Sequence, residues 1–213
     1  MYATLAMWLS QPSNASFSLL IHAERTPESW IMRAYDKFPP LLFHEPPHAD
    51  KYSREHFRGA RKYYKTLASL PHGSNLWTLL GTLWHALSER EWPARYLLLW
   101  VVLEGLYGSS HPQETTFRLA QRAALHLERD RIGAQRLFRE MKTAYSWRSR
   151  VAHGMQPAQM RKLTPELSNH LSSFVEQVVW RSLRSVLSSR TTIGLFANPK
   201  QRQTYLDELP FRR

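Results

Sequence analysis

The chain has 213 residues, of which 43% are hydrophobic and eight are tryptophan, so it holds enough apolar material for one sizeable core. It contains no cysteine, which excludes a disulfide framework, thiol catalysis and zinc sites built on thiolates, and which agrees with a reducing compartment. The net charge of +12 favours polyanions as partners, and nucleic acid is the commonest of these.

Residues 1–73 are predicted to form a loop-rich N-terminal extension. Seven of the thirteen prolines lie within residues 1–71. Because a proline ring fixes φ and removes a backbone donor, long helices are not expected in this segment. One strand is predicted at "FSLLIHA", residues 17–23.

Two short motifs in this extension are candidates for a metal site and for an RNA-contacting surface. His44 and His48 lie in "FHEPPHAD", but Pro46 and Pro47 prevent the helix that would align them, so we predict no metal site. The segment "KYSREHFRGARKYYK", residues 51–65, interleaves basic and aromatic side chains. That pattern is typical of an RNA-contacting surface and equally of a solvated helix.

No targeting or membrane-spanning segment is predicted. No basic region precedes the short apolar stretch at the N-terminus, as it would in a signal peptide. The longest apolar run, Tyr96 to Leu103, stops at Glu104, well short of the ~20 residues that a membrane span needs. We therefore expect a cytoplasmic protein with no membrane partner.

From residue 74 to residue 190 the apolar residues recur at helical spacing, which predicts an all-α bundle. Its five main helices are expected at residues 74–90, 94–108, 115–131, 133–153 and 164–186. The second is apolar almost all round, so it should be the central, buried helix. Trp77, Trp84 and Trp100 lie on apolar stripes and are expected in the core. Residues 191–213 are predicted to form an irregular tail.

Arg148 has an unusual position on the fourth predicted helix. At about 100° per residue from Leu137, Arg148 falls at about 20°, within the apolar stripe of Met141, Ala144 and Val151. A guanidinium in such a stripe costs several kcal/mol unless it is paired or lies at an interface. We therefore expect a partner residue, a ligand or a subunit boundary beside Arg148.

Glu104 and His153 each have two interpretations. Glu104, the acid of the second helix, either orients Arg148 or reaches solvent as a helix-end carboxylate. His153 lies about 140° from Arg148 around the helix, with Ser149 between them. His153 either has a catalytic role together with Arg148 or has only a structural role at the end of the helix, where Gly154 follows as a left-handed cap.

The segment "RSRVAH" has an arginine and a histidine separated by four residues, and it resembles the R-x4-6-H signature of the HEPN superfamily (higher eukaryotes and prokaryotes nucleotide-binding). Its context, "FREMKTAYSWRSRVAHG" after "RLAQRAALHL" and "RYLLLWVVLEGLYG", resembles the Apea-like branch over roughly residues 76–190. The resemblance implies an HEPN-like helical bundle with ribonuclease chemistry at a dimer interface. Arg148 and His153 would be catalytic, and Ser149 and Glu104 would support them. Met155 stands where nucleotidyltransferase-modified relatives have tyrosine, so that modification is not expected.

We therefore expect a metal-independent endoribonuclease that cleaves single-stranded RNA without a cofactor. It would act as a homodimer through the C-terminal half of the fourth helix, as a bacterial defence or toxin effector, with other defence-system proteins as further partners. Between residues 118 and 161 the chain has ten basic and three acidic residues. From this excess we expect RNA contacts at Arg118, Arg122, Lys142 and Arg150.

Two alternatives remain open from the sequence. One is a catalytically inactive HEPN module that only binds RNA, a nucleotide or a protein partner. The other is a purely structural helical dimer.

Overall fold

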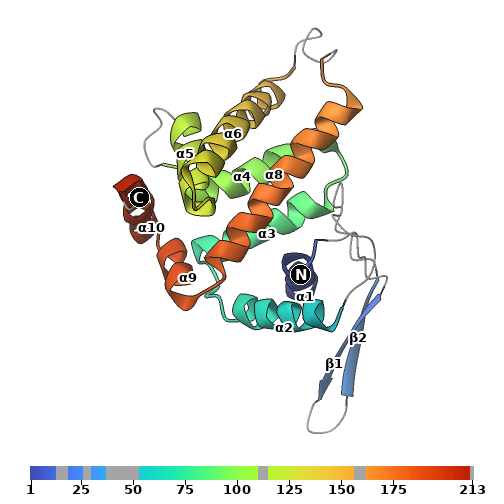
Figure 1. The fold of residues 1–213 in the computed structure, drawn as a ribbon. Coiled ribbons are helices and arrows are strands. Elements are labelled where there is room, and N and C mark those ends of the chain that lie inside the picture. Colours follow the sequence, from blue (N-terminus) through green and yellow to red (C-terminus); the bar gives the residue numbers. More distant parts are fainter. Residues whose placement is uncertain (13–18, 26–29, 37–52, 110–114, 156–161, 212–213) are drawn as a thin grey trace.

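The computed structural model describes residues 1–12, 19–25, 30–36, 53–109, 115–155 and 162–211. Its main body is an all-α bundle, as the hydrophobic spacing predicted (Figure 1). The five main helices are α3 (Asn75–Ser88), α4 (Trp92–Tyr107), α5 (Thr115–Leu127), α6 (Arg131–Ala152) and α8 (Pro165–Val186). Ser74, Asp130 and Thr164 cap α3, α6 and α8, because each side chain accepts a backbone N–H in the first turn. The cap at Asp130 also explains why α5 ends at Leu127, earlier than predicted.

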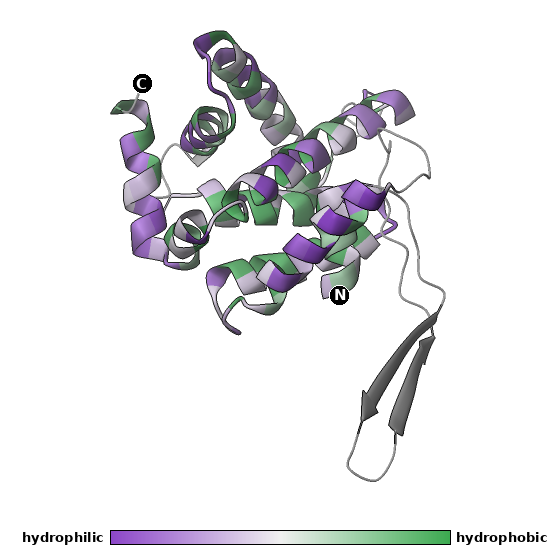
Figure 2. Ribbon diagram, turned by 60° about the horizontal axis from the view of Figure 1, so that its bottom comes forward, coloured by the Kyte–Doolittle hydropathy of each residue, from purple (hydrophilic) through white to green (hydrophobic). Residues whose placement is uncertain are grey.

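Helix α4 is the central element, as its nearly uniform hydrophobicity predicted. It packs against α3, α5, α6 and α8. Its fully buried residues include Leu99, Trp100, Val102, Leu103 and Leu106. Figure 2 shows hydrophobic residues gathered on the inward faces of the helices and hydrophilic residues on the outward faces. This arrangement buries the apolar surface that stabilises the fold.

The three tryptophans expected in the core are buried to different degrees. Trp100 is fully buried, and Trp84 is partly buried against the core. Trp77 is half-buried, with its indole N–H donating to the Tyr2 hydroxyl at 2.8 Å. The prediction that all three tryptophans lie in the core is therefore confirmed in full for Trp100 alone.

Within the described residues, the N-terminal segment is more regular than predicted, and the expectation that it contains no long helix was wrong. It contains α1 (Tyr2–Ser10), β1 (Leu19–Arg25), β2 (Trp30–Asp36) and α2 (Arg54–Ala68). The prolines of this segment lie between Pro12 and Pro47 and at Pro71, so residues 1–11 and 48–70 contain none and can form helices. A proline restricts only its immediate neighbours, so the proline content of the whole segment does not exclude helices in the parts that lack proline.

The two strands pair antiparallel, with Leu19 opposite Asp36 and Arg25 opposite Trp30. β1 confirms residues 19–23 of the strand predicted at 17–23. In Figure 1 the hairpin extends from the helices, whereas α1 lies against them. Leu5, Trp8 and Leu9 of α1 are almost fully buried, and α1 is therefore part of the core.

The C-terminal segment is also helical, so the predicted irregular tail was wrong. It contains α9 (Arg190–Ala197), α10 (Pro199–Glu208) and a 3₁₀ turn (Leu209–Phe211). Ser189 and Asn198 cap the two helices. These helices are short, but tertiary contacts hold them, because Phe196 and Leu206 are almost fully buried.

No helix within the described ranges is both long and apolar enough to cross a membrane.

Candidate functional site

Arg148 lies on α6 with its guanidinium facing Glu104 on α4. The Nη2 atom of Arg148 is 3.0 Å from Oε1 and 3.4 Å from Oε2 of Glu104. The two side chains are 25% and 28% exposed, so the pair is partly shielded from water. Of the alternatives that the sequence left open, the structure thus has Glu104 as the partner of Arg148.

Tyr145 completes a three-residue cluster with Arg148 and Glu104. Its hydroxyl donates to Oε1 of Glu104 at 3.3 Å, and the guanidinium carbon of Arg148 lies 5.4 Å from its ring centre. Burial, followed by the negative charge of Glu104, raises the pKa of Tyr145, so the phenol remains a proton donor near neutral pH. The cluster holds the guanidinium on the α4 side of α6.

A groove of about 680 Å³ lies beside this cluster, between α5 and the C-terminal part of α6. It is lined by Thr116, Lys142, Tyr145, Ser146, Ser149, Arg150, His153 and Gly154. These residues provide two cations, one imidazole and four hydroxyl groups, and the described lining contains no carboxylate. Such a lining suits a ligand that carries phosphate groups, because it offers charge and hydrogen-bond donors without a repelling anion.

Within one chain, the groove brings Ser149 and His153 together but does not include Arg148. The reason is helical geometry, since Arg148 and His153 are about 140° apart around α6. Tyr145 lies at the boundary, because it lines the groove and also donates to Glu104.

A second depression, of about 550 Å³, borders the cluster at Glu104. It is lined by Glu104, Gly108, Ser109, Pro199, Lys200, Arg202 and Gln203. Arg202 donates to the carbonyl oxygen of Gly105, which fastens α10 to α4 beside Glu104. The cluster of Arg148, Glu104 and Tyr145 therefore contributes Tyr145 to the groove and Glu104 to the second depression.

Two of the four predicted RNA-contacting cations lie in the groove. Lys142 is exposed, with its ammonium 5.5 Å from the ring centre of Phe138, and Arg150 is half-buried, 4.6 Å above the ring of Trp147. These aromatic contacts orient the cations without neutralising them. Arg118 is partly exposed on α5, outside the residues that line the groove.

Arg122 was wrongly predicted to bind RNA. Its side chain is 4% exposed, and its Nη1 donates to the carbonyl oxygens of Tyr107 and Gly108 at 3.1 and 3.0 Å. Its Nη2 lies 2.5 Å from Oδ1 of Asp207 on α10. Arg122 therefore joins the end of α4 to the C-terminal helices and has no surface to offer a ligand.

The end of α6 has the capped geometry that its sequence predicted. Gly154 has φ +77°, a left-handed conformation that glycine adopts without a Cβ penalty. His153 is the capping residue itself, and its side chain is exposed. The structural interpretation of His153 is thus confirmed, and it is compatible with a chemical role because the imidazole faces the groove.

Thr116 and Ser146 line the groove but were not identified from the sequence. Ser146 lies one helical turn before Ser149, and this spacing is a signal that would have found it. Thr116 comes from α5, and no pattern in the sequence connects it to the end of α6.

No metal site is present in the part of the chain that the structure describes, where no three His, Asp or Glu side chains lie close enough to share an ion. His44 and His48, considered above, lie outside the described residues.

No protein-family model matches the chain, and comparisons with curated proteins and with solved structures find no match.

Proposed function

We propose that the protein is a metal-independent, HEPN-type endoribonuclease that cleaves single-stranded RNA and acts as a bacterial defence or toxin effector. One observation carries the proposal. His153 and Ser149 share a groove with Lys142 and Arg150, and Arg148 is held beside that groove by Glu104. An imidazole beside free cations and a fixed guanidinium is the set of groups that phosphodiester cleavage by a neighbouring hydroxyl requires.

In the proposed reaction, His153 accepts the proton of a ribose 2′-OH, and the 2′-oxygen attacks the adjacent phosphorus. The bond from phosphorus to the 5′-oxygen breaks, and that oxygen leaves with a proton from an imidazolium. The products are a 2′,3′-cyclic phosphate and a 5′-hydroxyl end, so atoms and charges balance without a metal-bound water. Arg148 would offset the negative charge that develops on the phosphate, since a guanidinium remains charged at all working pH values.

A second copy of the chain is part of the proposal. Arg148 and His153 lie on different sides of α6 in one chain, so a cleft shared by two copies is needed to bring both groups to one phosphate. Val151 is half-buried and Ala152 is exposed at the C-terminal end of α6, which leaves apolar surface for such an interface. Light scattering at micromolar concentration should give the mass of a dimer. A monomer would contradict this part of the proposal.

The decisive experiment is cleavage of labelled single-stranded RNA in excess chelator, followed by analysis of the product ends. His153→Ala should lower the rate by about 10²- to 10⁴-fold, because it removes the proton-transfer group. Arg148→Ala should lower it at least as much. Both variants should keep their thermal unfolding close to that of the parent, because His153 is exposed and the pair of Arg148 with Glu104 is partly solvated.

His170→Ala and Arg139→Ala are matched controls, because both side chains are exposed and lie outside the groove. They should cleave like the parent. If His153→Ala and Arg148→Ala fold normally and still cleave, the assignment of the site is wrong. If all activity disappears with chelator, the metal-independent mechanism is wrong.

The second candidate function is an HEPN module that binds RNA without cleaving it. It is favoured by the separation of Arg148 from the groove and by the engagement of its guanidinium with Glu104. RNA affinity at the groove with no detectable cleavage by the dimer would select this candidate.

A further inference from the structure

Helix α2 carries a stripe of positive charge that belongs to neither the groove nor the bundle core. The stripe consists of Arg54, Arg58, Arg61, Lys62 and Lys65, and all five side chains are exposed. Arg54, Arg58, Arg61 and Lys65 follow one another at intervals of four, three and four residues. At about 100° per residue the five cations fall within about 100° of the helix circumference, so they form one face.

Among the residues that the structure describes, no carboxylate neutralises the stripe. No ion pair joins any of its five cations to a carboxylate within the described ranges. The acid of α2, Glu55, is in the first turn, where it offsets the positive end of the helix dipole. A solvated helix usually mixes charges of both signs to avoid self-repulsion, and this face carries one sign only.

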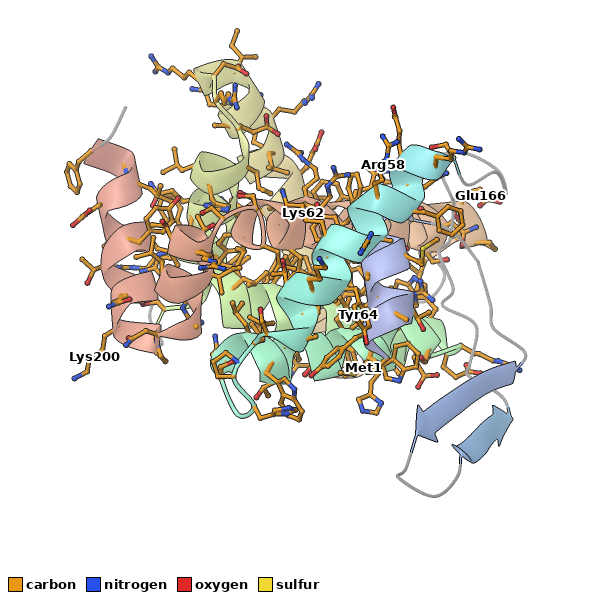
Figure 3. All side chains as sticks on the ribbon, turned by 90° about the horizontal axis from the view of Figure 1, so that it is seen from below. Met1, Arg58, Lys62, Tyr64, Glu166 and Lys200 are labelled. Atoms are coloured by element: carbon orange, nitrogen blue, oxygen red, sulfur yellow. The ribbon has the colours of Figure 1, made fainter. Side chains whose placement is uncertain are left out.

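Aromatic side chains border the stripe along one edge. Tyr64 is 47% exposed and Phe57 is 56% exposed, and both lie at about 280–300° when Arg54 is set at zero. Figure 3 looks onto α2, with Arg58, Lys62 and Tyr64 labelled along it. A flat ring beside a row of cations can stack on an unpaired base while the cations hold the backbone phosphates.

The opposite face of α2 is already occupied. Ala60 and Leu67 are buried, and α2 packs against α1, where Ser10 Oγ donates to the carbonyl oxygen of His56 at 2.6 Å. The apolar face of this amphipathic helix is therefore not available for insertion into a lipid surface. Its outward face offers charge and rings, which favours a nucleic acid over a membrane.

We propose that the basic stripe of α2 binds the phosphate backbone of single-stranded nucleic acid, with Tyr64 stacking on a base. From Arg54 to Lys65 the stripe extends about 16 Å, at about 1.5 Å per residue. One strand of stacked DNA carries a phosphate about every 3.4 Å, so about five phosphates match the five cations in number. The surface would contact backbone phosphates and the faces of bases, which all sequences share. It should therefore bind RNA and single-stranded DNA of any sequence.

This surface is separate from the groove and does not depend on the proposed function. In Figure 1 α2 lies at the bottom of the helical part of the molecule, whereas the C-terminal end of α6 lies at the top. No residue of α2 lines the groove. The stripe would therefore hold a strand independently of any chemistry at His153.

The test is the binding of full-length protein to a fluorescein-labelled 20-nucleotide oligouridylate, measured by anisotropy over a range of KCl concentrations. The triple variant Arg58→Gln/Arg61→Gln/Lys65→Gln should weaken binding by about tenfold or more. It should also make the slope of log K against log[KCl] shallower by about 2, because each lost contact contributes about 0.7 for a single strand. Tyr64→Ala should weaken binding by about tenfold with the slope unchanged, and Tyr64→Phe should bind like the parent.

The matched control is Arg136→Gln/Arg139→Gln/Arg190→Gln, which removes the same charge from exposed positions outside the stripe. Equal loss in both triple variants would mean that only net charge matters and would overturn the proposal, as would an unchanged stripe variant. Binding of phosphatidylserine vesicles in place of oligouridylate would also overturn it. His153→Ala should bind oligouridylate with the affinity of the parent. The cleavage assay therefore tests the proposed mechanism, and the binding assay tests the stripe, independently of each other.

Discussion

Arg95 in α4 and Glu176 in α8 form an ion pair inside the core, and its removal gives a sharp test of the packing. The two side chains are 3% and 0% exposed. Nε of Arg95 donates to Oε1 of Glu176 at 2.7 Å, and Nη2 lies 2.5 Å from the same oxygen without hydrogen-bond alignment. Because neither charge reaches water, the loss of one partner leaves the other charge in a medium of low polarity.

The perturbation is Arg95→Met, which keeps most of the apolar stem and removes the charge. Breaking a buried pair in this way costs about 3–5 kcal/mol of unfolding free energy. For a chain of this size, 1 kcal/mol corresponds to about 2–4 °C, so the Tm should fall by roughly 6–20 °C. Urea unfolding followed by far-UV circular dichroism at pH 7 measures the loss.

The double variant Arg95→Met/Glu176→Leu separates charge burial from packing. It replaces both charged groups by apolar ones, and such replacements are often neutral or stabilising, so it should recover most of the stability that Arg95→Met loses. Two outcomes would refute the reasoning. One is a loss below about 1 kcal/mol in Arg95→Met, which would mean that water reaches the pair; the other is a double variant no more stable than Arg95→Met.

Three further predictions concern the burial of His126, the backbone conformation of Gly154, and the different locations of Arg122 and Lys142. Burial lowers the pKa of His126 from 6.5 to about 4, so between these pH values the unfolded chain binds a proton that the folded chain does not. The free energy of unfolding should fall by at most about 3 kcal/mol as the pH is lowered through this window, and His126→Phe should remove that part of the dependence, as urea midpoints at several pH values would show. Gly154→Ala should lower stability by roughly 1–2 kcal/mol in thermal unfolding, because no atom lies within 4 Å of the added Cβ and the cost comes only from φ +77°. Arg122→Met should lower the Tm and leave the affinity for oligouridylate at the parent value, because Arg122 is buried. Lys142→Gln should weaken RNA binding and leave the Tm unchanged, because Lys142 lines the groove. A loss of affinity in folded Arg122→Met would contradict the assignment of Arg122 to the interior.

Local patterns in the sequence were sufficient to predict the helices of the bundle and the apolar environment of Arg148. A helix of 3.6 residues per turn places Arg148 among apolar neighbours whatever surrounds the helix, so the need for a partner was predictable. All-round hydrophobicity identified α4 as the central helix, and a glycine directly after the expected helix end identified Gly154 as the cap of α6. These features depend on residues within a few turns of one another.

Contacts between distant segments were decided only by the tertiary structure. Arg122 looked like a surface cation until the C-terminal segment, predicted to be irregular, was found to be helical and to bring Asp207 against it. Arg95 and Glu176 are 81 residues apart, and no local pattern indicates that they meet. The separation of Arg148 from His153 was predictable from their angle around α6. What lies on each side, a partner carboxylate from α4 and a groove bordered by α5, depends on how the helices pack, because burial and pairing are properties of the assembled core and not of any one segment.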